Sequence, residues 1–243
     1  MRIEKYLADM GFGSRKEVKQ LITTGQVTLG GVTCRKVGTQ VVPGQDEVQV
    51  AGQVVHYQRY YYYLLHKPQG IISATEDNQH RTVIDWLGEA YRHQDLFPVG
   101  RLDIDTTGLL LLTNNGQLAH QLLAPKKKVH KVYEATIQGL VDEQDIMAFE
   151  TGLDLGDFVS QPAQLKVLSH DVDRQQSEVA VTIVEGKFHQ VKRMFEAVGK
   201  RVVRLHRRQM GPLVLEDELP VGHWRELKPS EQKALEPFGY CAD

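Results

Sequence analysis

The stretch Gly100-Arg101-Leu102-Asp103-Ile104-Asp105-Thr106-Thr107-Gly108 runs directly into Leu109-Leu110-Leu111-Leu112-Thr113-Asn114. Four leucines between Gly108 and the turn sequence Asn114-Asn115-Gly116 predict a strand buried on both faces, although a buried helical turn would give the same pattern. One arginine and two carboxylates then lie beside a rigid element, which is a common position for functional side chains. A purely structural role also fits, with Arg101 paired to Asp103 and with Asp105 and Thr106 forming a turn.

The composition is that of a globular protein of one or two domains. Hydrophobic residues make up 41% and charged residues 25% of the 243 residues. No apolar run approaches the ~20 residues that span a bilayer, and the first residues form an amphipathic pattern rather than a signal peptide. Cys34 and Cys241 lack metal-ligand spacing, so we expect no metal site, no membrane association and a cytoplasmic location.

The charges are distributed unevenly along the chain. Residues 187–208 contain eight Lys and Arg against one acid, whereas residues 142–157 contain six acids and no Lys or Arg. Such segregation predicts a polyanion-binding face with a solvated acidic side opposite to it. Two merely solvated surface stretches are the alternative.

Residues 1–58 indicate a small separate domain. Ile3, Tyr6 and Leu7 share one helical face, and Ser14 with Glu17 forms a capping box that begins a second helix. Short β-like pieces follow around a hairpin turn at residues 30–31. Two short helices with basic outer residues, followed by hairpins, resemble the S4 RNA-binding domain, and that resemblance implies RNA contacts from Arg15 and Lys16. A dimerisation arm is the alternative.

Residues 59–243 predict a larger α+β domain with a mixed, mostly antiparallel sheet. Tyrosines 60–63 and Trp86 are expected in the core. On the strand predicted at 129–136, Lys131 and Tyr133 point to the same face, where they could bind a nucleotide or pack as a cation beside a half-buried ring. Gly186 is expected to begin a helix whose N-terminal amides favour an anion.

Four ordered blocks carry a resemblance to a known family. They are Gly100-Arg101-Leu102-Asp103, Lys67-Pro68-Gln69-Gly70, Lys131-Val132-Tyr133 and the run from Gly186 to Met194. Together with the S4-like front end, the chain resembles the RsuA branch of RNA pseudouridine synthases over nearly its whole length. The resemblance implies an isomerase that needs neither metal nor cofactor and modifies a uridine of 16S rRNA, uridine 516. A 23S rRNA uridine is the alternative target.

The resemblance also implies roles for individual residues. Asp103 would be the nucleophile, Tyr133 would stack on the base and help remove the C5 proton, and Lys192 would pair with the aspartate, with adjacent Arg193 as the alternative partner. Arg101 would fill the gap left by the flipped base. Further RNA contacts are expected from Lys67, Lys131, Lys187, His189, Gln190 and Arg193. The expected partner is 16S rRNA or a small-subunit assembly intermediate, bound by a monomer.

Two competing functions remain at this point. Asp103-Ile104-Asp105-Thr106-Thr107 also fits the Asp-x-Asp-x-Thr loop of haloacid-dehalogenase-like phosphatases, although that loop should follow a buried strand rather than precede one. A non-catalytic ribosome-binding protein would explain the basic residues but not the grouping of Asp103, Tyr133 and Lys192.

Overall fold

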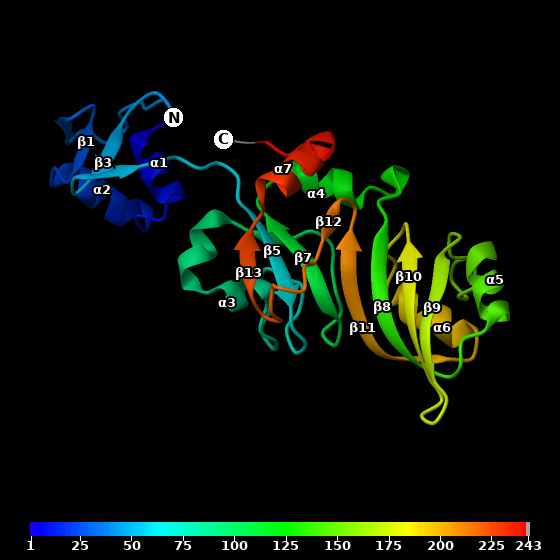
Figure 1. Cartoon of the computed structure of the whole chain (residues 1–243). Helices are drawn as coiled ribbons and strands as arrows, with labels where there is room; N and C mark the ends of the chain where they lie inside the picture. Colours follow the sequence, from blue (N-terminus) through cyan, green and yellow to red (C-terminus); the bar gives the residue numbers. More distant parts are fainter. Residues whose placement is uncertain (242–243) are drawn as a thin grey trace. The chain divides into compact units, whose positions relative to one another are not determined.

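A computed structural model describes residues 1–241, which form two compact units (Figure 1). The first comprises residues 1–61 together with 87–96, and the second comprises residues 62–86 together with 97–241. Segment 87–96 therefore groups with the N-terminal unit, although it follows the first strand of the larger one in sequence.

The N-terminal unit packs two helices on a four-stranded antiparallel sheet. Its elements are α1 (Ile3–Asp9), α2 (Arg15–Thr23), β1 (Val27–Leu29), β2 (Val32–Cys34), β3 (Val48–Val50) and β4 (Gln53–Val55), with strand order β2-β1-β3-β4. The capping box between Ser14 and Glu17 is present at the start of α2, as the sequence predicted. Arg15 and Lys16 are exposed in the first turn of α2, where their side chains are available to a polyanion.

The larger unit is built on one nine-stranded sheet, whose strands lie side by side in Figure 1. The strands are β5 (Tyr62–Lys67), β6 (Phe97–Pro98), β7 (Thr107–Thr113), β8 (Lys131–Gln138), β9 (Gln164–Asp171), β10 (Gln176–Ile183), β11 (Arg201–Met210), β12 (Leu213–Val214) and β13 (Trp224–Glu226). The main order is β13-β5-β7-β11-β8-β10-β9, in which β7 and β11 run parallel and the other neighbours are antiparallel. The predicted mixed, mostly antiparallel α+β fold is confirmed.

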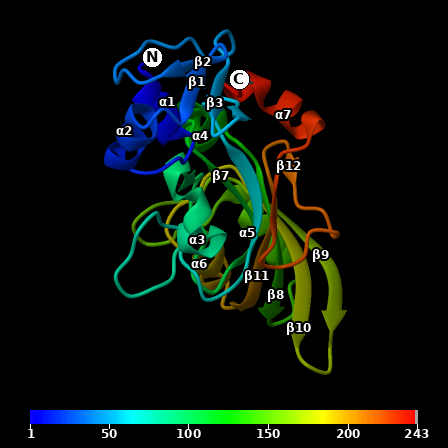
Figure 2. The same cartoon turned by 90° about the vertical axis from the view of Figure 1, so that its left-hand side faces the viewer.

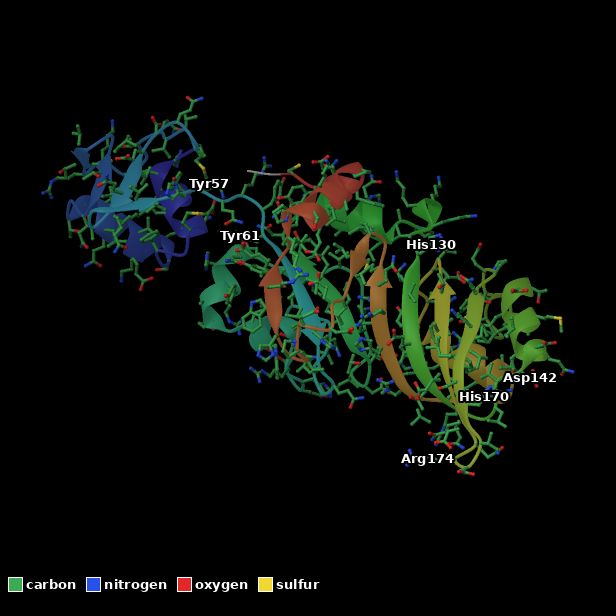
Figure 3. The ribbon with its side chains drawn as sticks, viewed as in Figure 1. Tyr57, Tyr61, His130, Asp142, His170 and Arg174 are labelled. Atoms are coloured by element: carbon green, nitrogen blue, oxygen red, sulfur yellow. The ribbon has the colours of Figure 1, made fainter. Side chains whose placement is uncertain are left out.

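Short helices and 3-10 turns make up the remaining elements of the chain. They are α3 (Val83–Leu87), α4 (Gly116–Leu123), α5 (Glu143–Thr151), α6 (Gln190–Ala197) and α7 (Pro229–Leu235), with 3-10 turns η1 (Glu89–Gln94, in the first unit), η2 (Pro125–Lys127) and η3 (Glu236–Phe238). Strands β9 and β10 extend beyond the sheet as a long hairpin (Figure 2), with Arg174 at its tip (Figure 3). His170 on β9 bonds to the Val141 carbonyl at 2.9 Å, which ties this hairpin to the chain entering α5.

Strand β7 is the centre of the sheet. Leu109, Leu110, Leu111 and Leu112 are fully buried between β5 and β11, so the predicted buried strand is correct and a helical turn is excluded. Gly108 begins this run with φ of +114°, and a Cβ atom there would lie 2.3–2.9 Å from the Arg207 backbone. Glycine is therefore required for β7 to approach β11 so closely.

Two local predictions need correction. The tyrosine-rich sequence predicts a strand over residues 60–65, followed by a turn in which Lys67 and Gly70 flank Pro68. Strand β5 instead continues through His66 and Lys67, which pair with Leu109 and Gly108 of β7, so the turn begins at Pro68. Trp86 is half-buried rather than a core residue, because its indole N–H donates to the Gly222 carbonyl at 2.8 Å. Tyr61, Tyr62 and Tyr63 are buried as expected.

Candidate active site

A hollow in the larger unit collects most of the residues singled out from the sequence. Its lining comes from the loop before β7, from β8, from the β10–α6 connection and from β11. Polar side chains in the lining include Arg101, Asp103, Thr106, Tyr133, Lys187, His189, Gln190 and Lys192. Leu102, Ile183, Val191 and Leu205 supply an apolar part of the wall. Residues from Arg101 to Leu205, many of them distant in the chain, therefore meet around Asp103.

The backbone of the loop at 102–106 is held at every carbonyl. Such complete engagement fixes the position from which Asp103 acts, because each carbonyl has a defined donor. The donors are Ser73 Oγ to Leu102 (2.9 Å), Lys67 Nζ and Thr106 N to Asp103 (2.9 and 3.0 Å), Gly70 N to Ile104 (2.8 Å), Gln69 Nε2 to Asp105 (3.0 Å) and Lys67 Nζ to Thr106 (2.9 Å).

Lys67 is part of this support and not a surface cation. It is fully buried, and its ammonium donates to the carbonyls of Pro68, Asp103 and Thr106. The expectation of a direct RNA contact from Lys67 does not fit this position, because its three N–H donors are already used within the protein. Burial lowers the pKa of Lys67 to about 8, opposed by the nearby Asp103 and Asp105 carboxylates.

Lys192, on α6, is the cation that pairs with Asp103. Its Nζ lies 3.0 Å from Asp103 Oδ2 and also 2.7 and 3.0 Å from the two carboxylate oxygens of Asp105. Burial raises the pKa of Asp105, but the hydrogen bond and charge of Lys192 outweigh this and hold the pKa below its usual value. Asp105, which the sequence suggested as a turn former or as part of a phosphatase-like loop, is therefore a second acidic partner of Lys192.

Arg193, the alternative partner, points elsewhere. Its guanidinium bonds to the Asp157 carboxylate and, at 2.6 Å, to the Leu155 carbonyl, and it lies over the Phe158 ring. The expected RNA contact from Arg193 is thus replaced by an intramolecular one.

The same pairing alters the predicted charge segregation. Asp145 and Asp157 of the acidic stretch pair with Lys200 and Arg193 of the basic one. Five of the eight basic residues in 187–208 have carboxylate partners: Lys192, Arg193, Lys200, Arg204 and Arg208. The basic stretch is therefore not a continuous polyanion-binding face.

Helix α6 begins later than the sequence predicted, at Gln190. His189 adopts φ of +50°, which interrupts the helical backbone, so Gly186 does not begin the helix. Gln190 is buried, accepts from the Lys187 amide at 2.9 Å and donates to Glu185 at 2.7 Å. The side-chain amide of Gln190 therefore supports the 185–190 segment. Because this amide is buried and already hydrogen-bonded within the protein, the expected RNA contact from Gln190 does not fit its position. His189 is exposed, with Nε2 3.6 Å from Asp103 Oδ1.

Tyr133 and Lys131 both face inward from β8, as their spacing predicted, and both are buried. Tyr133 lines the hollow. Lys131 Nζ donates to the Val129 carbonyl at 3.2 Å, so the expected phosphate contact from Lys131 is not available at the surface. Burial, with the charge of Arg207, lowers the pKa of Lys131 to about 8, against the attraction of Glu185.

The buried position of Arg207 on β11 was not predicted from the sequence. It is buried, and its Nε donates to the Leu109 carbonyl at 2.8 Å. In sequence Arg207 looks like one more member of a basic run, and only its pairing opposite Gly108 and Tyr133 places it inside the sheet. Its charge lowers the pKa values of both Lys67 and Lys131, so three buried cations lie close enough to influence one another.

The position of Lys67 predicts an alkaline limit of activity. As pH rises through about 8, the Lys67 ammonium loses a proton, only two N–H donors remain for three carbonyls, and the loop carrying Asp103 loosens. We expect single-turnover rates to decline above this pH. The Lys67→Met variant should be slower than wild type, and its rate should not decline further above this pH. The Lys131→Met variant should keep the alkaline decline. An unchanged alkaline decline in Lys67→Met would exclude Lys67 as its source.

The phosphatase alternative does not fit the geometry. Buried strand β7 follows the Asp103–Asp105 loop, and the space between the two carboxylates holds the Lys192 ammonium. Among residues 1–241, no group of three or more His, Cys, Asp or Glu side chains has an arrangement that could hold a metal ion.

No helix among residues 1–241 is both long and apolar enough to cross a bilayer.

Two family models match this chain. The family model for RNA pseudouridylate synthase matches residues 61–197, and the S4 domain model matches residues 1–47. The chain is also similar to a crystal structure of a pseudouridylate synthase, with 32% identity, a TM-score of 0.66 and coverage of 97% of this chain and 99% of the other.

Full-length relatives bear related names. The chain is 44% identical to an uncharacterized RNA pseudouridine synthase, YtzG, of Bacillus subtilis, with 97% of this chain and 98% of the relative covered. It is 39% identical to ribosomal small subunit pseudouridine synthase A of Pseudomonas aeruginosa (95% and 98% covered) and 39% identical to ribosomal large subunit pseudouridine synthase B of Bacillus subtilis (96% and 95% covered). The chain therefore belongs to the RsuA-type RNA pseudouridine synthases, in which an S4 domain precedes the catalytic domain.

Proposed function

We propose that this enzyme converts a specific uridine of 16S rRNA, uridine 516, to pseudouridine with Asp103 as its nucleophile. The observation that carries the catalytic assignment is the pairing of Asp103 with Lys192 at 3.0 Å in a hollow also lined by Tyr133. A carboxylate suits the task because it is ionised at neutral pH and can both attack and leave. The neighbouring ammonium offers a counter-charge to this carboxylate while the bound base excludes water.

The reaction moves one bond and conserves all atoms. The bond between uracil N1 and ribose C1′ breaks, the uracil turns within the hollow, and a bond forms between C5 and C1′. C5 gives up a proton, and N1 ends with one. Asp103 attacks either the base or the sugar carbon and is released before the product leaves. Each of these steps needs the base outside its helix, which agrees with a site reached by base flipping.

Tyr133 is proposed to lie against the uracil and to assist removal of the C5 proton. Its burial in the lining, on a strand paired to β10 and β11, supports a fixed position for the ring. Arg101 is exposed beside Asp103 in sequence, which supports its proposed role of filling the gap left by the flipped nucleotide.

Exposed cations are proposed to hold the RNA backbone. Lys187 at the hollow and Arg15 and Lys16 on α2 are exposed, so their charges are available to phosphates. Binding should weaken steeply with salt, because each neutralised phosphate releases counterions. We also propose that the enzyme acts as a monomer in the cytoplasm, where ribosomal RNA and small-subunit assembly intermediates are made.

The choice of target is tested by mapping. A relative named for the small subunit supports 16S rRNA, and one named for the large subunit is equally similar. Carbodiimide sequencing of both rRNAs from a strain lacking the protein should show the loss of one pseudouridine, at 16S uridine 516. Loss of a 23S site instead would overturn the target, and an unchanged map would favour a protein that only binds ribosomal RNA.

Replacing the cation tests the catalytic pair. Lys192→Gln should lower kcat about 100-fold, because Asp103 and Asp105 would then face each other without a counter-charge. Lys192→Arg should recover part of the rate, since it restores the charge with a different shape. The matched control is the adjacent Arg193→Gln, which loses only the contacts to Asp157 and Leu155 and should cost much less. Equal losses in both would argue against the Asp103–Lys192 pair.

A further inference from the structure

Phe188 is an exposed aromatic residue at the edge of the hollow. Its side chain is 68% exposed, and its neighbours in sequence, Lys187 and His189, both line the hollow. A single exposed apolar residue is ordinary on a protein surface and has no meaning by itself. What distinguishes Phe188 is the way its ring is held in relation to Asp103.

The Phe188 ring is stacked on the ring of His189. Their centroids are 3.8 Å apart and their planes differ by 19°. The same imidazole places Nε2 3.6 Å from Asp103 Oδ1. The two rings therefore form a continuous aromatic surface that starts beside the nucleophile and ends at solvent.

The backbone that presents this surface is strained and braced. His189 has φ of +50°, which is uncommon and unfavourable for residues other than glycine. The brace is a hydrogen-bond network around the buried Gln190: Gln190 bonds to the Lys187 amide and to Glu185, and Glu185 also accepts from the Gln161 amide at 2.7 Å. A segment held in this way keeps an apolar ring in water, which indicates a surface kept free for a ligand.

The charges around the rings point to a nucleotide. Lys187 precedes Phe188, and Arg101, which is also exposed, lines the same hollow. A flat aromatic surface among cations matches a base that stacks on the ring while its phosphates meet the charges. Apolar side chains of a protein partner would not make use of these cations.

We propose that Phe188 is a stacking platform for the base of a nucleotide adjacent to the target uridine. This inference rests on the RNA pseudouridine synthase activity with Asp103 as nucleophile, and it adds a residue that determines which RNA context is accepted. Stacking tolerates every base but is stronger for larger rings, so a purine at this neighbouring position should be preferred over a pyrimidine.

The test is a double-mutant cycle that combines one protein substitution with one change in the RNA. The probe is a short rRNA fragment carrying the mapped uridine with tritium at C5, in which the nucleotide on either side is made abasic in turn. Phe188→Ala should lower kcat/KM on the intact fragment by about 10-fold, since base–aromatic stacking has that order of effect. One abasic RNA should show a similar loss with the wild-type enzyme and no further loss with Phe188→Ala. Phe188→Trp should retain wild-type kcat/KM.

The controls separate this proposal from the others. Val221→Ala removes a comparably exposed apolar side chain, 56% exposed, away from the hollow lining and should leave kcat/KM unchanged. The platform would be overturned if the losses of kcat/KM caused by Phe188→Ala and by each abasic RNA were independent and multiplied together. It would also be overturned if Phe188→Ala lowered kcat/KM by less than threefold. If the wild-type enzyme releases tritium only from 23S fragments, the proposed target fails, and the same cycle on that RNA still decides the role of Phe188.

Discussion

Asp103→Asn is expected to lower tritium release from C5-labelled uridine RNA by about 1000-fold or more. The change keeps the shape of the side chain but removes the negative charge needed to attack and to leave. RNA affinity should remain within about threefold of wild type, because Asp103 is one half-buried group while exposed cations and the S4 domain hold the phosphates. Rates should be measured in single turnovers and affinities by filter binding.

The matched control for this variant is Asp105→Asn. Asp105 shares the Lys192 ammonium with Asp103, so it carries the same kind of charge in the same loop. Its loss should cost no more than about 10-fold, because Lys192 would still face Asp103. Turnover retained in Asp103→Asn, or an equal loss in both variants, would remove Asp103 from the proposed mechanism.

Gly108→Ala is expected to lower the free energy of unfolding by about 4 kcal/mol or more. The added methyl would meet the Arg207 backbone at 2.3–2.9 Å, and φ of +114° is unfavourable for any residue with a Cβ. The parallel contact between β7 and β11 would have to open. Thermal melting followed by circular dichroism should show a midpoint lower by roughly 10 °C, or failure to fold.

Gly116→Ala is the matched control for the backbone effect. Gly116 opens helix α4 with ordinary φ, and no atom lies within 4 Å of the position that its Cβ would take. Alanine there should leave the melting temperature unchanged or slightly higher, because it favours the helix. A similar loss of stability in both variants would mean that glycine is not specifically required at residue 108.

The sequence predicted those parts of the fold that depend on local pattern. The four leucines of β7, the capping box at Ser14 and the shared face of Lys131 and Tyr133 all follow from periodicity or from short-range hydrogen bonds. The order of the strands could not be derived in this way, since it depends on pairings between distant segments such as β7 with β11.

The candidate site was predicted as a set of residues, but several individual roles were not. Lys67 and Lys131 have the residue type of phosphate ligands, and their burial becomes visible only when the sheet is assembled. Arg193 and Lys192 are adjacent and chemically alike, and the geometry of α6 alone decides which reaches Asp103. Sequence supplies the chemical groups, whereas long-range packing assigns their partners.

The loop at 102–106, in which every carbonyl accepts a hydrogen bond, has a consequence for the choice of substrate. If Asp103 is the nucleophile, as proposed, this stiff support prevents it from moving out to meet a uridine that stays stacked in a duplex. The RNA must therefore deform to bring the uridine to Asp103. The free energy of unstacking and unpairing that nucleotide is smallest where base pairing is already absent. We expect the enzyme to act most readily on bulges, internal loops and regions left open before the ribosomal particle is complete.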